Sequence, residues 1–264
     1  MKFSYNTVIG RSPSLWRWHV DNVLRNAGIS RSYWDFNVYL YYNEKIPSET
    51  TDELISICKE NNIAHELHYE NPHESFLNRL YAAWNRVQLM GQSDVVIRGG
   101  SDQAFAPFSF SRAFDHWERE SAKGEVVLNF QTIESDFVQG QSRHYVRPFG
   151  TTPETFNETA FVDFADTIAI GRAVDIHEAM SLWDGKPGPF HSSLGYPHYR
   201  GDGASWMMSK GVFMKYGPMP PMQGGFTGDV LIHDRMERAR VRSLILGDVI
   251  TYHLAAGESR ERFI

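Results

Sequence analysis

The first hundred residues alternate between short apolar runs and amphipathic stretches, and this alternation constrains the fold more than any other feature of the sequence. The apolar runs predict four strands and the amphipathic stretches predict three intervening helices. The expected strands are Phe3–Gly10, Phe36–Tyr42, Ala64–His68 and Asp94–Arg98, and the expected helices are Ser14–Ala27, Ser48–Glu60 and Ser75–Met90. Strands that alternate with helices predict a parallel sheet with helices on its faces.

The pattern is less regular after residue 100. We expect a helix over Ser109–Ala122, a strand over Val126–Phe130, regular structure over Ser205–Tyr216, a helix over Asp229–Arg240 and a last strand over Val249–His253. The stretch Asp136–Gly203 is rich in glycine, proline, histidine and aromatic residues, which is typical of loops that line a cleft. No linker divides the chain. We therefore expect one α/β domain over residues 1–264, with a nucleotide-binding half over 1–130 and a variable half over 131–264.

Composition excludes several classes of function. The 264 residues carry a net charge of −6, so no overall positive field favours a polyanionic partner. The single cysteine, Cys58, cannot form an intramolecular disulfide or a cysteine-based zinc site, and its apolar surroundings in the sequence predict a core position. Neither a signal peptide nor a run of about 18 apolar residues is present, so we expect a cytoplasmic protein without an integral membrane segment.

Three short segments carry candidate chemistry. The first is Gly99–Pro107, which follows the expected strand Asp94–Arg98. Ligands bind where parallel strands end, and a carboxylate such as that of Asp102 can bind a hard divalent cation there. The alternative is that Asp102 only caps the following turn. Familiar phosphate-loop, dinucleotide, zinc-protease and serine-hydrolase motifs are absent from the sequence.

The second segment, Gly224–Arg235, places glycines before an aspartate at a helix start. Asp229 could act there as a general base for a hydroxyl group, or it could simply cap the helix. The third segment, Tyr252–Arg260, places His253 after a strand and before a small-residue loop. A neutral imidazole can complete a metal site whose other ligands are oxygens, although a lone histidine is more often structural.

The order and separation of these segments resemble the GT-A nucleotide-sugar glycosyltransferases, and within them the large inverting family 2 group. In that group an Asp-x-Asp motif ends the fourth strand, a Gly-Gly-Phe segment precedes an Asp, and a His follows near the end of the domain. The resemblance implies a Rossmann-like GT-A fold and transfer of a sugar from a nucleotide diphosphate sugar to a hydroxyl acceptor. Asp102 and His253 would hold Mn²⁺ or Mg²⁺, and Asp229 would be the base.

The chain departs from the family pattern at three places. Gly100 stands where the first Asp of the metal motif is expected, so Asp102 is the acid of the motif that this chain keeps. Ser101 or Gln103 could assist it in binding the donor. Gly228 stands where a Glu precedes the base. The end of the second strand reads Tyr-Tyr-Asn-Glu, so Asn43 or Glu44 would replace the family's base-contacting Asp.

The resemblance also implies donor contacts elsewhere. Gly10 and Arg11, after the first strand, would face the nucleotide, and the arginine could pair with phosphate. Arg79, with Asn78 or Asn85, would lie near the nucleotide and the metal loop. The alternative for Arg79 is a solvated helix face.

The acceptor is expected on aromatic residues of the irregular stretch and its end, namely Trp183, His191, Tyr196, His198, Tyr199 and Trp206. A glycan, a lipid-linked sugar or a modified nucleic-acid base would each supply a hydroxyl. A cluster of arginines, Arg235, Arg238, Arg240 and Arg242, leaves open an enzyme that glycosylates modified DNA bases. The losses at Gly100 and Gly228 leave open a module that binds a nucleotide or glycan without turnover.

Overall fold

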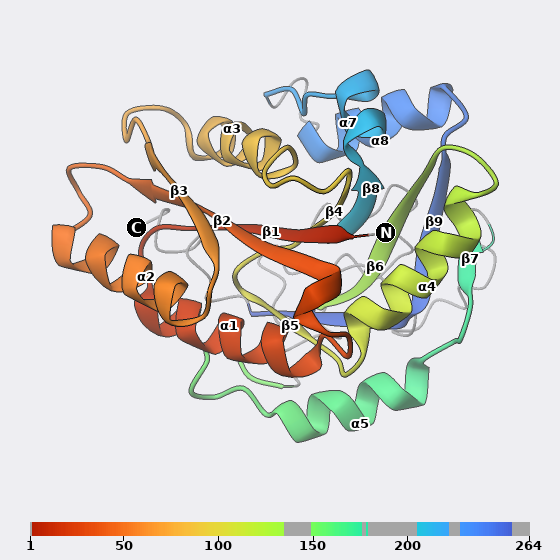
Figure 1. Cartoon of the computed structure of the whole chain (residues 1–264), viewed down its shortest axis with the longest axis horizontal. Helices are drawn as coiled ribbons and strands as arrows, with labels where there is room; N and C mark the ends of the chain where they lie inside the picture. The colour runs from red at the N-terminus through yellow and green to blue at the C-terminus, as the bar shows by residue number, and fades with distance from the viewer. Residues whose placement is uncertain (1, 135–148, 176–177, 179–204, 222–227, 255–264) are drawn as a thin grey trace, which may run out of the picture.

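The computed structural model describes residues 2–134, 149–175, 178, 205–221 and 228–254 (Figure 1). Within these residues the strands form one sheet of nine strands in the order β3-β2-β1-β4-β8-β6-β9-β5, with β7 paired to β9. The strands are β1 Phe3–Ile9, β2 Trp34–Tyr42, β3 Ala64–Tyr69, β4 Val95–Arg98, β5 Gln103–Phe105, β6 Val126–Glu134, β7 Ala173–Asp175, β8 Trp206–Ser209 and β9 Arg242–His253.

Most of the sheet runs in one direction. Strand β1 pairs in parallel with β2 and β4, β2 pairs in parallel with β3, and β6 pairs in parallel with β9. Strand β8 joins the two groups through antiparallel pairs with β4 and β6, and β5 and β7 run antiparallel to β9. The prediction of an α/β fold with a mostly parallel central sheet is therefore confirmed, and the carboxyl ends of β1, β2, β3 and β4 meet at one edge.

Helices cover both faces of this sheet (Figure 1). They are α1 Pro13–Asn26, α2 Ser48–Glu60, α3 Phe76–Val87, α4 Ser109–Ser121, α5 Glu158–Ile168, α7 Lys210–Tyr216 and α8 Gly228–Arg238, with a 3₁₀ turn at Arg31–Tyr33. Helices α1, α2 and α4 pack on one face of the sheet, and α3, α7 and α8 pack on the other. Helix α5 packs against β9. None of the described helices is long and apolar enough to cross a membrane.

The two faces follow from the two-residue period of the strands. Phe36, Val38 and Leu40 of β2 share the largest core cluster with residues of α1, α2 and α4. Tyr39 and Tyr41, which alternate with them, pack against α3 on the other face. Cys58 is fully buried in the first of these clusters, as predicted, and burial raises the pKa of its thiol to about 11.

The structure differs from the prediction mainly in the second half of the chain. Strand β9 begins at Arg242 rather than Val249, because a register shift opposite Phe130 and Gln131 lets the strand continue past Gly247 and Asp248. The short strand β5 and, within 136–203, helix α5 and strand β7 were not predicted. Strand β6 crosses residue 130, so the sheet is continuous across the expected boundary between the two halves.

Candidate functional site

The loop that follows β4 brings two of the predicted residues together. Residues 99–102 lead from β4 into β5, and Gln103 of β5 lies opposite His253 of β9 in the antiparallel ladder. The Nε2 atom of His253 lies 2.9 Å from Oδ2 of Asp102. The backbone N–H of Leu254 donates to the Asp102 carbonyl at 2.8 Å, so backbone bonds hold both side chains in place. Both side chains remain partly exposed, at 28% for the histidine and 15% for the aspartate.

Gly100, where the resemblance leads us to expect an acid, makes room for this contact. A Cβ atom at Gly100 would lie 2.7 Å from Oδ1 of Asp102, so a larger residue would displace the carboxylate. The Gly100 N–H donates to Oε1 of Gln103 at 2.9 Å, and the hydroxyl of Ser205 donates to the same oxygen. Gln103 and Ser101 are both buried, and the side-chain amide oxygen of Gln103 holds the loop together. A donor contact by either residue remains a prediction.

The Asp102 carboxylate is held in its charged form by its neighbour. Burial alone would raise the pKa of this carboxyl, but the charge and the hydrogen bond of His253 outweigh burial and hold the pKa below its ordinary value. The pKa of the nearby buried His19 falls from 6.5 to about 4, chiefly because burial disfavours its charged form. His19 is therefore neutral at pH 7.

The Asp102–His253 pair fits a divalent cation. An octahedral ion of the Mg²⁺ type holds its ligands at about 2.1 Å, so two adjacent ligand atoms lie about 3 Å apart. Oδ2 and Nε2 lie 2.9 Å apart in a hydrogen bond, so the Nε2 proton would have to leave before both atoms could bind one cation. No cluster of three or more His, Cys, Asp or Glu side chains suitable for a metal occurs among the described residues. A metal at this pair would thus need further oxygen ligands, and Mg²⁺ sites commonly draw these from substrate phosphates and water.

The start of α1 lies at the same edge of the sheet. Gly10 follows β1, and a Cβ atom there would lie 2.3 Å from the ring of Tyr41, so no other residue fits. Ser12 caps α1 by accepting the N–H of Leu15 at 3.3 Å. Arg11 stands immediately before this cap. A helix N-terminus with an adjacent arginine has the chemistry of an anion site.

Asn43 directly follows β2, and Arg79 of α3 contacts Glu70, which directly follows β3. The Oδ1 atom of Asn43 accepts the backbone N–H of Lys45 at 2.9 Å, which leaves its buried Nδ2 group without a hydrogen-bond partner among the described residues. Arg79 is not on a solvated face: its side chain is 9% exposed, and its guanidinium donates to the Glu70 carboxylate at 2.8 Å. Glu44 is exposed and accepts the hydroxyl proton of Tyr69 at 2.9 Å.

Asp229 occupies the first turn of α8, where its Oδ1 accepts a hydrogen bond of 3.3 Å from the hydroxyl of Tyr81 on α3. There is a steric reason for glycine at position 228, where the resemblance leads us to expect a glutamate. A Cβ atom at this position would lie 2.3 Å from the carbonyl oxygen of Pro220 and 3.1 Å from the Tyr81 ring. Asn85 of α3 holds Met219, which precedes α8 in the chain. Its Oδ1 accepts the Met219 N–H at 2.8 Å, and its Nδ2 donates to the Met219 carbonyl at 3.0 Å.

One expectation about the acceptor side is wrong. Trp206 is fully buried, because its ring packs 3.6 Å from the Arg98 guanidinium and its Nε1–H donates to Gln88, so it cannot stack on a sugar. The other expected acceptor residues, Trp183, His191, Tyr196, His198 and Tyr199, lie outside the described residues, as do Gly224–Thr227 and residues 255–260.

Two polar residues that support the loop between β4 and β5 were not among the predicted site residues. His19 and Asn22 of α1 are completely buried and contact the backbone of β5. Their signal was present in the sequence as polar residues at helical spacing on a face otherwise formed by Trp16, Val20 and Val23. Buried polar groups of this kind are retained where they have a hydrogen-bonding role.

No protein-family model and no curated protein sequence matches the chain. Solved structures do. A mannosyltransferase from Pyrobaculum calidifontis in complex with GDP-Man and Mn²⁺ matches over 97% of this chain, with a TM-score of 0.58 and 10% identity. TarS residues 1–349 from S. aureus matches over 100% of this chain, with a TM-score of 0.57 and 12% identity. GalNAc-T7 with UDP, GalNAc and Mn²⁺ matches over 98%, with a TM-score of 0.59 and 13% identity.

These similarities define the fold of the chain. The chain covers 58%, 62% and 45% of the lengths of the three matched chains, in the same order. The matches to these glycosyltransferases span 97% or more of this chain, so it has the GT-A fold of nucleotide-sugar glycosyltransferases. At this level of identity the similarity shows the fold alone, and membership of family 2 remains a prediction.

Proposed function

We propose that this chain is a glycosyltransferase that moves a sugar from a nucleotide diphosphate sugar to a hydroxyl acceptor with the help of Mn²⁺ or Mg²⁺. The observation that carries the proposal is the contact between Asp102 and His253 on the loop after β4. In a GT-A fold this loop lies at the sheet edge where the parallel strands end, which is where α/β sheets bind ligands.

The donor would lie along the carboxyl ends of β1, β2 and β4. Its diphosphate would face the N-terminus of α1, where Arg11 and the positive end of the helix dipole favour negative charge. The backbone of Gly10 would face the diphosphate on the side away from the Tyr41 ring. Ser101 and Gln103 would shape the loop beneath it, and Arg79 would support the donor pocket through its ion pair with Glu70.

Asn43 would contact the base of the nucleotide. Because its Oδ1 already accepts the Lys45 N–H, the group left for a ligand is the Nδ2 donor. Such a donor complements a carbonyl oxygen or an unprotonated ring nitrogen on the base and does not complement a ring N–H. Asn43 would thus donate a hydrogen bond to the base, whereas the aspartate expected from the resemblance would accept one.

Asp102 and His253 would hold the cation, which would neutralise the charge that develops on the departing diphosphate. Asp229 would accept the proton of the acceptor hydroxyl as that oxygen attacks the anomeric carbon. The new bond joins the acceptor oxygen to the anomeric carbon, and the bond that breaks joins this carbon to the diphosphate oxygen. The nucleoside diphosphate leaves with that electron pair, and in-line attack inverts the anomeric configuration.

The arginines that could have suggested a nucleic-acid acceptor are largely engaged within the protein. Arg235 donates to the carbonyls of Tyr216 and Pro218, and Arg242 forms an ion pair of 2.7 Å with Glu120. Arg238 lies 3.8 Å from Asp234. We therefore favour a glycan or lipid-linked sugar as the acceptor over a modified nucleic-acid base.

The test is a panel of nucleotide sugars, incubated with the full chain and Mn²⁺, in which release of the nucleoside diphosphate is followed. We expect release with at least one donor, loss of release on chelation of the metal, and loss of release in Asp102→Ala. Release that persists unchanged in Asp102→Ala would refute the metal assignment. Nucleotide binding that is insensitive to chelation, with no release from any donor, would favour a module without turnover.

A further inference from the structure

Strand β5 is an edge strand whose outer side is closed by side chains instead of by another strand. It is the last strand of the sheet order, and its ladder partner is β9. The groups on its other side include the carbonyl of Gln103 and the N–H of Phe105. Unpaired groups on an edge strand leave it free to shift or to pair elsewhere, so a functional loop attached to such a strand needs another support.

Helix α1 supplies that support. Nδ1 of His19 lies 2.9 Å from the Gln103 carbonyl oxygen, and the Phe105 N–H donates to Oδ1 of Asn22 at 2.7 Å. The two helix residues are three positions apart, so they lie on one face of α1. A carbonyl can only accept, so Nδ1 of His19 carries the proton and donates it. Nε2 then accepts the hydroxyl proton of Tyr5 at 2.9 Å.

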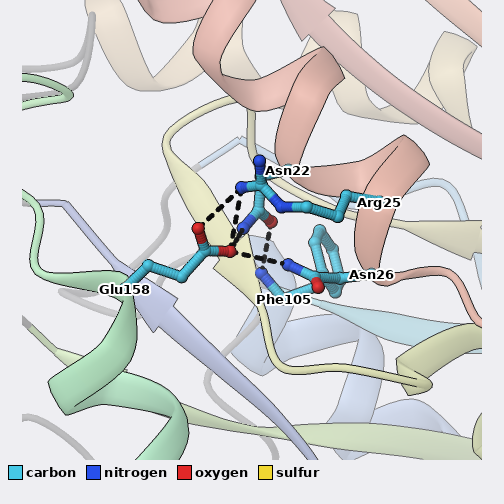
Figure 2. A network of polar contacts seen from close by, with 5 residues as sticks. All are labelled: Asn22, Arg25, Asn26, Phe105 and Glu158. Carbon is cyan, nitrogen blue, oxygen red and sulfur yellow. Dashed lines mark hydrogen bonds and ion pairs between the residues drawn. The ribbon is translucent and has the colours of Figure 1, made fainter.

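The asparagine of this pair is fixed in turn by helix α5 (Figure 2). Its Nδ2 group donates to Oε1 of Glu158 at 3.3 Å, and Asn26 donates to the same oxygen at 3.0 Å. Arg25 binds both oxygens of this carboxylate, at 2.9 and 2.7 Å. The Asn22 amide therefore has a fixed orientation, with its oxygen toward Phe105.

The β5 backbone that α1 holds also carries the candidate metal ligands. Asp102 directly precedes Gln103, and Gln103 lies opposite His253 in the ladder. A shift of β5 would change the separation of the Asp102 and His253 side chains. It would also strain the bond from the Leu254 N–H to the Asp102 carbonyl.

We infer that His19 and Asn22 form a clamp that positions the Asp102–His253 pair for its cation, with His19 as the main positioning residue. The inference rests on the proposed function, because it assigns the clamp to the same metal site. Burying two polar side chains on an apolar helix face is unfavourable unless their hydrogen bonds are made. In known metal sites, loss of a residue hydrogen-bonded to a ligand side chain weakens metal binding by about 10- to 100-fold, and we expect an effect of this size when the backbone that carries the ligands is released.

The experiment compares two substitutions of the same residue. His19→Phe fills the space but removes the donor, whereas His19→Asn places an amide N–H near the position of Nδ1. Mn²⁺ affinity is measured in the presence of a nucleoside diphosphate by electron paramagnetic resonance of free Mn²⁺. We expect about 10- to 100-fold weaker binding in His19→Phe and binding within about threefold of wild type in His19→Asn.

A second readout needs no metal. Hydrogen exchange of the Phe105 and Leu254 amides should accelerate in His19→Phe and remain near the wild-type rate in His19→Asn. The matched control is Val23→Ala, which removes buried methyl groups from the same helix but no hydrogen bond to β5. This control should lower stability while leaving Mn²⁺ affinity and both amides unchanged relative to global unfolding.

The outcomes separate the two ideas. If His19→Phe binds Mn²⁺ with wild-type affinity, the clamp is refuted and the proposed function still stands. Equal weakening by Val23→Ala would also overturn it, because the effect would then follow stability. Absence of Mn²⁺ binding and of turnover in the wild type would refute the proposed function and, with it, the role of the clamp.

Discussion

The two chemical groups of the candidate site are held in different ways. Asp102 and His253 sit on backbone that the β5–β9 ladder and the Leu254 amide fix directly. Asp229 stands on the first turn of α8, where its side chain is oriented through a long hydrogen bond of 3.3 Å from Tyr81. The proposed cation half of the site would thus be organised before any ligand arrives, whereas the proposed base half would depend on side-chain contacts between two helices.

This difference matches the chemistry proposed for each half. A cation site needs its ligands at fixed separations, because a displacement of a few tenths of an ångström costs affinity. A general base must instead meet a hydroxyl whose position is set by the acceptor, and apo geometry at such a residue is often loose. Substitutions in the two halves should therefore have different kinetic signatures.

The largest effect is expected for Asp102→Asn. Loss of the anionic ligand should lower the transfer rate by about 1,000-fold, because metal stabilisation of a leaving group amounts to several kcal/mol. Weaker Mn²⁺ binding should accompany the loss. Asp115→Asn, an exposed carboxylate on α4, is the matched control and should retain the wild-type rate. Full activity of Asp102→Asn would contradict the proposal that Asp102 and His253 form a cation site separate from the base.

Asp229→Asn should lower the rate by about 100-fold or more while Mn²⁺ and donor affinities stay within about twofold of wild type, because proton acceptance acts in the transition state. Asp234→Asn, on the same helix, should leave the rate unchanged. The measurement is a set of single-turnover rates beside calorimetric donor binding. Weaker donor binding in Asp229→Asn with no effect on the bound-state rate would contradict a base role.

His19 predicts a pH dependence of stability that belongs to the cation half. Its pKa is about 4 in the folded chain against 6.5 ordinarily, so between these values the unfolded chain binds more protons. Stability should therefore be greatest above about pH 6.5 and fall as the pH is lowered toward 4, with a total loss of about 3 kcal/mol from this group. Urea unfolding of wild type and His19→Asn across this range measures the difference. A difference that does not change with pH would rule out the buried neutral imidazole.

The smallest effect is expected for Tyr81→Phe. Loss of its hydrogen bond to Asp229 should lower the rate by about fivefold, which corresponds to about 1 kcal/mol, and leave Mn²⁺ affinity unchanged. Tyr216→Phe is the control, since it removes a similar hydroxyl-to-carboxylate bond, to Glu125, at 2.7 Å. Equal effects of the two substitutions would indicate that Tyr81 acts through stability alone.

Sequence periodicity predicted the parallel half of the fold well, because β1, β2 and β4 are buried on both faces and the helices there each have one apolar face. It missed β5, since three residues are too few to show a period. It also shortened β9, because Gly247 and Asp248 look like a strand end unless the bulge is known. Long-range pairing, which the local pattern does not contain, determines both features.

The candidate site was predictable only in part. The order of Asp102, Asp229 and His253 pointed to them through a family resemblance, but nothing local indicated that the first and last would touch. Trp206 shows the opposite failure: aromatic character suggested a sugar platform, but the residue packs against Arg98 in the core. Whether a polar or aromatic side chain faces a ligand depends on contacts between distant segments.

The most direct test is a crystal structure of the chain with Mn²⁺ and a nucleoside diphosphate, with anomalous scattering recorded at the manganese edge. We predict a peak within bonding distance of both Oδ2 of Asp102 and Nε2 of His253, with diphosphate oxygens completing its coordination. A bound nucleotide whose metal contacts neither side chain, or an intact hydrogen bond between the two with the metal elsewhere, would contradict the assignment of this pair as the cation site.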